Sequence, residues 1–279
     1  PVLAVFNSHI HGDHWLGNQA IRAKYPDVPI YGHERVGPKV IAGAGTEWIE
    51  LMLQMTENAT AGTVVVRPDH PVKDGDEIVI DDLTYVVMNN DKAHTDTDIM
   101  LHVRERGVMF LGDNAGHGRI LRLEGGSFPG NITALENALA TDAAVFVPGH
   151  GPSGGREVAE RYRDYLHTVY STAQQGVEEG LADFEIRPLL TPKLAPWEKW
   201  AGFDIELSAG ATRRARLCTS RQVQRRIGPS TERVTISCSP CSRSRAAGEE
   251  AVRPAARPTT TSPTSFSSTS TSAEPTAWP

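Results

Sequence analysis

The pattern of apolar and polar positions divides the chain into a patterned body and an unpatterned C-terminal segment. Short apolar runs bounded by turn residues predict strands at 2–6, 28–31, 64–66, 77–80, 85–88, 99–103, 108–111 and 144–147. Apolar side chains at helical spacing predict helices at 16–24, 46–57, 131–140 and 156–175. Strands that alternate with helices in this way indicate a layered α/β domain with its sheet inside.

The periodicity stops near Ser208. Ser and Thr supply 23 of the last 69 residues, and Pro supplies another seven. Such a composition buries too little apolar surface to fold. We therefore expect a domain at 1–208 and a disordered, low-complexity tail at 209–279. A natural tail and a change of reading frame in GC-rich DNA both account for a segment rich in Arg, Ser and Pro, and its lack of Lys favours the frame change.

Charge changes at the same place. The whole chain carries −6, and residues 211–279 hold eleven Arg against four Glu, so this segment carries +7 and residues 1–210 carry −13. An acidic body is a poor partner for a phosphate backbone, which argues against a nuclease or another nucleic-acid-binding protein. No run of about 18 apolar residues is present, so we expect no membrane span. The partner that we expect is a small-molecule substrate.

The three cysteines all lie in the tail, at Cys218, Cys238 and Cys241. The body therefore has no thiolate that binds metal or attacks a substrate. No basic stretch followed by an apolar one opens the chain, so no signal peptide is predicted. Because the chain begins with Pro1 rather than Met and the strand-like run at 2–6 follows at once, we expect a fragment or a processed chain. The sequence leaves the compartment open between cytoplasm and periplasm, and it leaves the oligomeric state open.

Candidate chemistry is concentrated in residues 7–18, where His9, His11, Asp13 and His14 form the pattern His-x-His-x-Asp-His. At this chain's composition the pattern arises by chance on the order of one time in a thousand. His9 and His11 follow a strand two residues apart and therefore point to one side. Asp13 and His14 come one turn later, so one loop serves two adjacent metal positions. Imidazole and carboxylate are normal zinc ligands, although iron or manganese accepts the same set.

Four side chains do not complete two metal sites, and three strand ends offer further ligands. His94 precedes the strand predicted at 99–103, Asp113 follows the one at 108–111, and His150 follows the one at 144–147. Each stands where an apolar run gives way to a turn, at the edge of the predicted sheet. We therefore expect seven side chains from distant parts of the chain to meet in one pocket.

These motifs together resemble the metallo-β-lactamase superfamily over roughly residues 2–205. The resemblance implies a four-layer αββα sandwich with further strands before the first motif, so we expect the first strands to be missing here. It also implies two metal positions bridged by Asp113, with His9, His11 and His94 at the first and Asp13, His14 and His150 at the second. A bridging Asp is similar to the glyoxalase II and lactonase branches, whereas true β-lactamases lack it.

The resemblance implies a hydrolase in which a hydroxide held by two Zn²⁺ attacks a small ester, thioester, lactone or amide. Two zinc ions, the carboxylates of Asp13 and Asp113 and the hydroxide leave a net charge of about +1, which attracts an acyl oxygen. Asp13 orients the nucleophile and is the catalytic residue that we predict. His117, four residues after Asp113, is a candidate substrate contact. Glyoxalase II carries a cysteine at that position, which disfavours a glutathione thioester as the substrate.

Three alternatives stay open. The first is a β-lactam hydrolase, which needs the same hydroxide and an open groove. The second is an oxygenase that resembles persulfide dioxygenases and uses a single iron. The third is a metal-binding protein without catalytic activity. Metal content, turnover of nitrocefin and a broad substrate panel separate these possibilities from the proposed zinc hydrolase.

Overall fold

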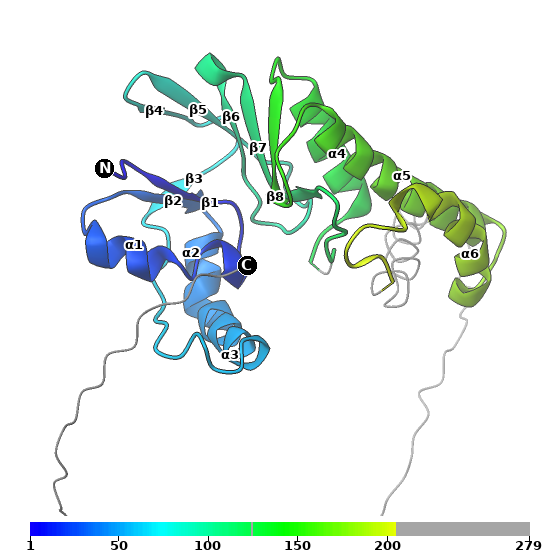
Figure 1. Cartoon of the computed structure of the whole chain (residues 1–279), viewed down its shortest axis with the longest axis horizontal. Coiled ribbons are helices and arrows are strands. Elements are labelled where there is room, and N and C mark those ends of the chain that lie inside the picture. The colour runs from blue at the N-terminus through cyan, green and yellow to red at the C-terminus, as the bar shows by residue number, and fades with distance from the viewer. Residues whose placement is uncertain (124, 205–279) are drawn as a thin grey trace, which may run out of the picture. The chain divides into compact units, whose positions relative to one another are not determined.

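The computed structural model describes residues 1–123 and 125–204, all of which belong to one compact unit of the chain. The domain boundary expected at 208 and the predicted tail lie outside the described residues. Two sheets and their flanking helices make up the described part (Figure 1).

The first sheet contains three parallel strands in the order β1 (Val5–Asn7), β2 (Ile30–His33) and β3 (His70–Val72). Three helices lie between these strands in the chain, α1 (Asn18–Lys24), α2 (Val36–Lys39) and α3 (Gly45–Met55), and a wide turn at Val40–Ala44 joins α2 to α3. Trp15, Val36 and Val40 are buried together, and Trp48 of α3 packs against them. The helices α2 and α3 are therefore fastened to the loop that follows β1.

The second sheet has five strands in sequence order, β4 (Glu77–Ile80), β5 (Leu83–Met88), β6 (Met100–Val103), β7 (Val108–Gly116) and β8 (Val145–His150). Neighbouring strands are antiparallel except for the final pair, β7 and β8, which is parallel. Parallel neighbours need a long crossover, and α4 (Phe128–Leu139) lies within it. Because β7 and β8 run in the same direction, their carboxyl ends meet at one edge of the sheet.

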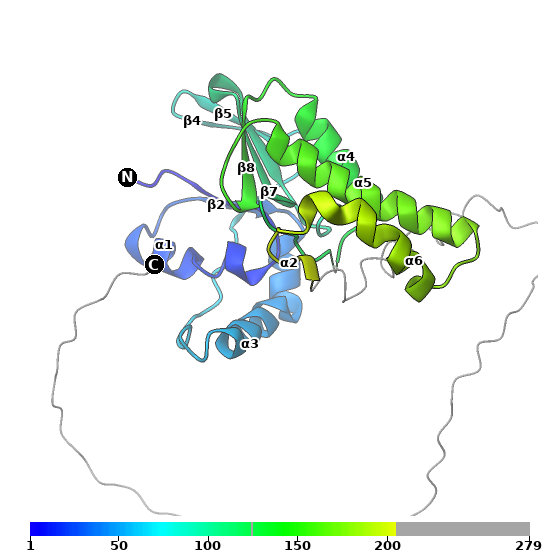
Figure 2. The same cartoon turned by 45° about the vertical axis from the view of Figure 1, so that its right-hand side comes forward.

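Helices α4 and α5 (Glu157–Glu178) lie along one side of the second sheet, and α6 (Asp183–Leu190) returns beside α5 (Figure 2). The largest core cluster fills the space between these helices and the sheet. The apolar stripe predicted on the long helix is buried there, with Val158, Tyr162 and Val169 at most 1% exposed. Burial of this stripe anchors α5 to the sheet that contains β7 and β8.

The two sheets pack face to face through a smaller apolar cluster. Val72 of the first sheet and Val87 and Leu101 of the second are buried in it. Phe6 of β1 stacks on Tyr85 of β5 with ring centroids 5.3 Å apart. Helices on the outer side of each sheet complete the four layers, so the predicted αββα sandwich is confirmed.

Three local predictions differ from the structure. Residues 64–66 form no strand, and Val64 and Val65 are 54% and 41% exposed. The third strand of the first sheet lies at β3 instead and contains Pro71, which an edge strand tolerates because its N–H side can face away from the ladder. The helix predicted at 46–57 ends at Met55, whose apolar side chain is 69% exposed. None of the helices in the described part is long and apolar enough to cross a membrane.

Candidate metal centre

The loop that carries the His-x-His-x-Asp-His pattern begins at the end of β1 and is closed by two buried asparagines. The Asn18 amide donates to Asn7 Oδ1 at 2.7 Å, and the Asn7 amide donates to Asn18 Oδ1 at 3.0 Å and to the His14 carbonyl at 3.1 Å. Both side chains are at most 3% exposed. The sequence interpretation missed this pair, although two asparagines that flank a ligand loop are a signal of loop closure.

Asp113 lies where β7 becomes irregular. The pairing of β7 with β8 shifts register on both sides of Gly112. Gly112 has φ of 53°, which favours glycine, and a Cβ there would lie 2.9 Å from the Ser8 Cβ. A Cβ on Gly149 of β8 would lie 1.9 Å from Asp113 Oδ1. The two glycines therefore leave the space in which the Asp113 carboxylate sits.

The structure brings the seven predicted ligands together in two adjacent groups. Candidate ligand atoms within each group lie within 4.8 Å of one another. The first group contains His9, His11, His94 and Asp113, and the second contains Asp13, His14 and His150. These are the two sets that the resemblance implies, and their role as metal ligands stays a prediction.

The first group is largely buried, with only His11 at intermediate exposure. His94 Nε2 lies 3.2 Å from His11 Nδ1, and Asp113 Oδ2 lies 3.5 Å from His94 Nε2 and 3.8 Å from His9 Nε2. The side chains of His9, His94 and Asp113 are 1%, 2% and 6% exposed. An ion held here would be surrounded by protein on most sides.

The second group is nearer to solvent. His14 Nε2 lies 3.4 Å from His150 Nε2, and Asp13 Oδ2 lies 3.3 Å from His150 Nε2 and 3.5 Å from His14 Nε2. The side chains of Asp13 and His150 are 43% and 29% exposed. A substrate therefore reaches this group more easily than the first.

Asp113 contacts both groups. Besides its contacts in the first group, its Oδ1 lies 3.2 Å from His14 Nε2 and its Oδ2 lies 3.5 Å from His150 Nε2. A single carboxylate between two sets of imidazoles has the placement expected of a bridging ligand.

Protonation differs between the two groups. Burial, reinforced by the other histidines, lowers the pKa of His9 well below its ordinary value, and burial lowers the pKa of His94 to about 4. Burial opposes the charged form of His14 too, but hydrogen bonds with Asp113 and Asp13 raise its pKa to about 9. The same two carboxylates raise the pKa of His150 to about 9. Without metal, the first group is therefore neutral at His9 and His94, and the second carries protons.

The carboxylates respond in the opposite direction. Burial would raise the pKa of Asp13 and Asp113, but hydrogen bonds with His14 and His150 outweigh it and hold both pKa values below the ordinary range. Both groups therefore stay ionised at neutral pH and are available as ligands.

The donor atoms fit metal ions. Among the described residues, His9 Nε2 is a buried ring nitrogen without any hydrogen bond, which is costly unless another partner binds it. Separations of 3.2 to 3.8 Å join the neighbouring nitrogen and oxygen atoms. Tetrahedral zinc with ligands at about 2.0–2.1 Å places its donors about 3.4 Å apart. The residues present therefore suit zinc, and they also suit iron or manganese.

One hydroxyl that the sequence interpretation missed links the two groups. Ser8 Oγ lies 3.0 Å from His9 Nδ1 and 3.0 Å from His14 Nδ1. A neutral ring that presents Nε2 to a metal carries its proton on Nδ1. Both rings then donate to Ser8 Oγ, whose two lone pairs accept both bonds. Ser8 therefore fixes the ring orientation and tautomer of one histidine in each group.

His117 lies beside the centre but in neither group. Its backbone N–H donates to the His150 carbonyl at 2.9 Å, while its Nδ1 lies 2.8 Å from the Pro152 carbonyl. The ring is thus occupied by a backbone partner. A contact between His117 and a substrate stays a prediction.

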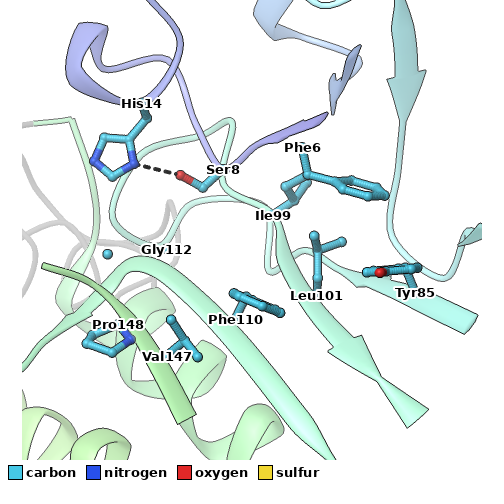
Figure 3. A pocket seen from close by; sticks show the side chains of 11 residues that line it. Phe6, Ser8, His14, Tyr85, Ile99, Leu101, Phe110, Gly112, Val147 and Pro148 are labelled. Atoms are coloured by element: carbon cyan, nitrogen blue, oxygen red, sulfur yellow. Dashed lines mark hydrogen bonds between the residues drawn. The ribbon is translucent and has the colours of Figure 1, made fainter. Parts of the chain in front are cut away.

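An apolar pocket of about 290 Å³ has His14 in its wall (Figure 3). Phe6, Tyr85, Leu101 and Phe110 are among its lining residues. Of the seven candidate ligands only His14 reaches its wall, next to the Ser8 that is bonded to His14 Nδ1.

The comparison with protein families decides the identity of the chain. A family model described as the metallo-beta-lactamase superfamily matches residues 1–150, more than half of the sequence. The chain belongs to the metallo-beta-lactamase superfamily. No curated protein sequence matches this superfamily member significantly.

Searches of solved structures found further similarities. The stereoselective inverting sec-alkylsulfatase Pisa1 from Pseudomonas sp. matches with a TM-score of 0.57 and 15% identity, over 79% of this chain and 41% of the sulfatase. The chain thus spans less than half of that relative. A metallo-beta-lactamase from Pontibacter korlensis matches with a TM-score of 0.44 and 18% identity, over 60% of this chain and 70% of the lactamase.

Proposed function

We propose that this chain is a metal-dependent hydrolase that uses two zinc ions to cleave a small ester, thioester, lactone or amide. The observation that carries the proposal is the pair of donor groups that meet at Asp113. Membership of the superfamily supports it. Metal ions held by these groups would lower the pKa of a water molecule and would polarise the acyl oxygen of a substrate.

The exposed carboxylate of Asp13 has the main catalytic part in this proposal. Its pKa lies below the ordinary range, so it is ionised at neutral pH and accepts a hydrogen bond from the attacking water. Its Oδ2 faces both imidazoles of the second group, which orients the carboxylate. The attacking water loses its first proton to solvent, and Asp13 holds the second at its carboxylate until the leaving group takes it, so the products are a carboxylate and the protonated leaving group.

The remaining residues bind and orient. Asp113 and the buried histidines of the first group exclude water from one side of the centre. The exposed face at His150 and Asp13 is the side on which a substrate approaches. The seven candidate ligands are all His or Asp, so they offer no apolar pocket that would select among substrates. The proposal therefore defines the substrate class by the bond that is cleaved.

Metal analysis and a substrate panel test the proposal. The purified full chain is expected to contain about two zinc ions and to hydrolyse members of a panel of esters, thioesters, lactones and amides. Removing the metal with a chelator should abolish turnover, and adding zinc should restore it. Alkyl sulfates belong in the panel because a sulfatase shares the fold.

The same measurements decide among the alternatives. Turnover of nitrocefin with no turnover of the panel would reassign the chain as a β-lactam hydrolase. One iron per chain with oxygen consumption on a persulfide would reassign it as an oxygenase. Full metal loading with no turnover of any substrate would contradict the enzyme assignment and leave a metal-binding protein.

A further inference from the structure

A chain of buried hydrogen bonds joins the loop of His94 to the loop of His9 and His11. Its members are Thr95, Thr97 and Asp98, which are 3%, 0% and 5% exposed. Thr95 Oγ1 donates to Asp98 Oδ1 at 2.6 Å, and the Thr95 N–H donates to Asp98 Oδ2 at 2.8 Å. None of the three belongs to either donor group within the described residues. The sequence interpretation assigned no role to them.

Counting protons fixes the direction of this chain. Both oxygens of Asp98 accept, so the single hydroxyl proton of Thr95 is used on the carboxylate. The 2.9 Å contact between the two threonine hydroxyls must therefore use the proton of Thr97. The lone pairs of Thr97 Oγ1 then accept from the Ile10 N–H, at 3.1 Å. The order is Ile10 to Thr97 to Thr95 to Asp98.

The chain ends on the peptide between two candidate ligands. Ile10 stands between His9 and His11, and its N–H is held by Thr97. Its carbonyl accepts from Trp15 Nε1 at 2.8 Å, and Trp15 is 1% exposed. Both polar backbone groups of Ile10 are therefore fixed by side chains.

The other end of the chain adjoins His94. Thr95 is the next residue, and its N–H and hydroxyl are both bound to Asp98. The Asp98 side chain is 5% exposed, so both carboxylate oxygens depend on donors within the protein. Keeping a carboxylate in the interior is costly unless it is well hydrogen-bonded. The buried charge therefore strengthens each donor bond along the chain.

We propose that Thr97, Thr95 and Asp98 are positioning residues that hold His9, His11 and His94 in binding geometry before a metal ion enters the first group. This inference rests on the proposed function of the site as a metal centre. This chain of hydrogen bonds holds three candidate ligands of the first group through the backbone, and it contacts none of their ligand atoms. Outer hydrogen bonds of this kind typically change metal affinity by about 10- to 100-fold.

The backbone links between the two loops survive removal of the hydroxyl. The Ile99 N–H donates to the Ser8 carbonyl at 2.7 Å, next to the Ile10–Thr97 bond. A Thr97→Val variant keeps the shape of the side chain and removes only the hydroxyl. It is therefore expected to fold, with the first group loosened.

The test measures zinc affinity by competition with a chromophoric chelator at pH 8. It is carried out in a His150→Ala background, which leaves only the first group complete. Thr97→Val should weaken affinity about tenfold or more, whereas Thr97→Ser, which keeps the hydroxyl, should restore it to within about threefold. The visible spectrum of bound Co²⁺ should change in the Val variant and not in the Ser variant, because it reports ligand geometry.

Thr141→Val is the matched control, because it removes a hydroxyl that donates to the Ala138 carbonyl at the end of α4, outside the centre. It should leave zinc affinity unchanged. Wild-type affinity and an unchanged Co²⁺ spectrum in Thr97→Val would overturn the inference, as would equal losses in Thr97→Val and Thr97→Ser. Should Thr97→Val fail to fold, Asp98→Asn replaces it with the same expectation.

Failure of the proposed function has a separate signature. A wild-type chain that binds no metal contradicts the metal centre itself. If the wild-type protein binds two ions and the Thr97→Val variant has unchanged affinity, only the positioning role of the hydrogen-bond chain is contradicted.

Discussion

The two donor groups share Asp113 but face different surroundings. His9 and His94 of the first group are 1% and 2% exposed, whereas Asp13 and His150 of the second are 43% and 29% exposed. Burial keeps the first pair neutral, and ionised carboxylates keep the second group protonated when no metal is bound. The difference shows how one loop contributes side chains both to a buried donor group and to a donor group open to solvent.

The largest expected effect comes from removing the carboxylate that the groups share. Asp113→Ala should reduce zinc content from about two ions to one or fewer and lower turnover by at least about 100-fold, because donors of both groups lose a partner. Elemental analysis and initial rates provide the measurement. Asp142→Ala is the control, since Asp142 is 86% exposed and its carboxylate pairs with His102. Unchanged metal content in Asp113→Ala would contradict the bridge.

The next effect is on pH dependence and distinguishes the groups directly. Metal binding requires unprotonated imidazole, so His14 and His150, with pKa values of about 9, must release protons at pH 7. His9 and His94 are neutral there and release none. The apparent affinity of the second group should therefore rise up to about 100-fold per pH unit between pH 7 and 8, and that of the first should stay nearly flat.

Calorimetry in buffers of different ionisation enthalpy measures these protons. The wild-type chain should release about two protons as both groups fill at pH 7, and the His150→Ala variant should release fewer. Equal pH slopes for the two binding steps would remove the distinction between the groups.

A smaller effect is expected from filling the space beside Asp113. In Gly149→Ala the new methyl group would collide with the Asp113 carboxylate and with the backbone of β7. Overpacking of this kind costs about 1–3 kcal/mol, so zinc affinity should fall about tenfold and the melting temperature should drop with it. Gly125→Ala is the control, because a Cβ there meets nothing within 4 Å. Normal affinity in Gly149→Ala would show that Asp113 does not need this space.

The smallest effect is expected at the hydroxyl between the groups. Ser8→Ala leaves the Nδ1 atoms of His9 and His14 without their shared acceptor. Zinc affinity of both groups should weaken together, by up to about tenfold, as chelator competition would show. Loss at one group alone would mean that Ser8 holds only one ring.

Much of the fold could be predicted because the pattern is strong where burial is one-sided. The strand at 77–80 and the long helix near 156–175 agree with β4 and α5, since a short apolar run and helical spacing, respectively, are explicit there. The strand predicted at 64–66 was wrong because three consecutive valines favour a strand locally, but the fold does not pair them with another strand. β3 was missed because Pro71 disfavours a strand in local terms.

The candidate site divides in the same way. The spacing of His9, His11, Asp13 and His14 is local, so the sequence alone predicted two adjacent metal positions. Ser8, Thr97 and Asp98 carried no such signal, because hydroxyls and carboxylates are common in turns. The role of Thr97 follows from a hydrogen bond between segments almost ninety residues apart in the chain, and the role of Ser8 follows from the ring orientations of His9 and His14, which spacing does not reveal.

The sequence by itself determined the ligand types, their order and the strand ends on which they stand, because these depend on short-range spacing. Only the tertiary structure decided which group is buried, which imidazoles carry protons and which outer side chains hold them. Burial and distance between charges set those properties, and both arise when the carboxyl ends of β1, β7 and β8 come together.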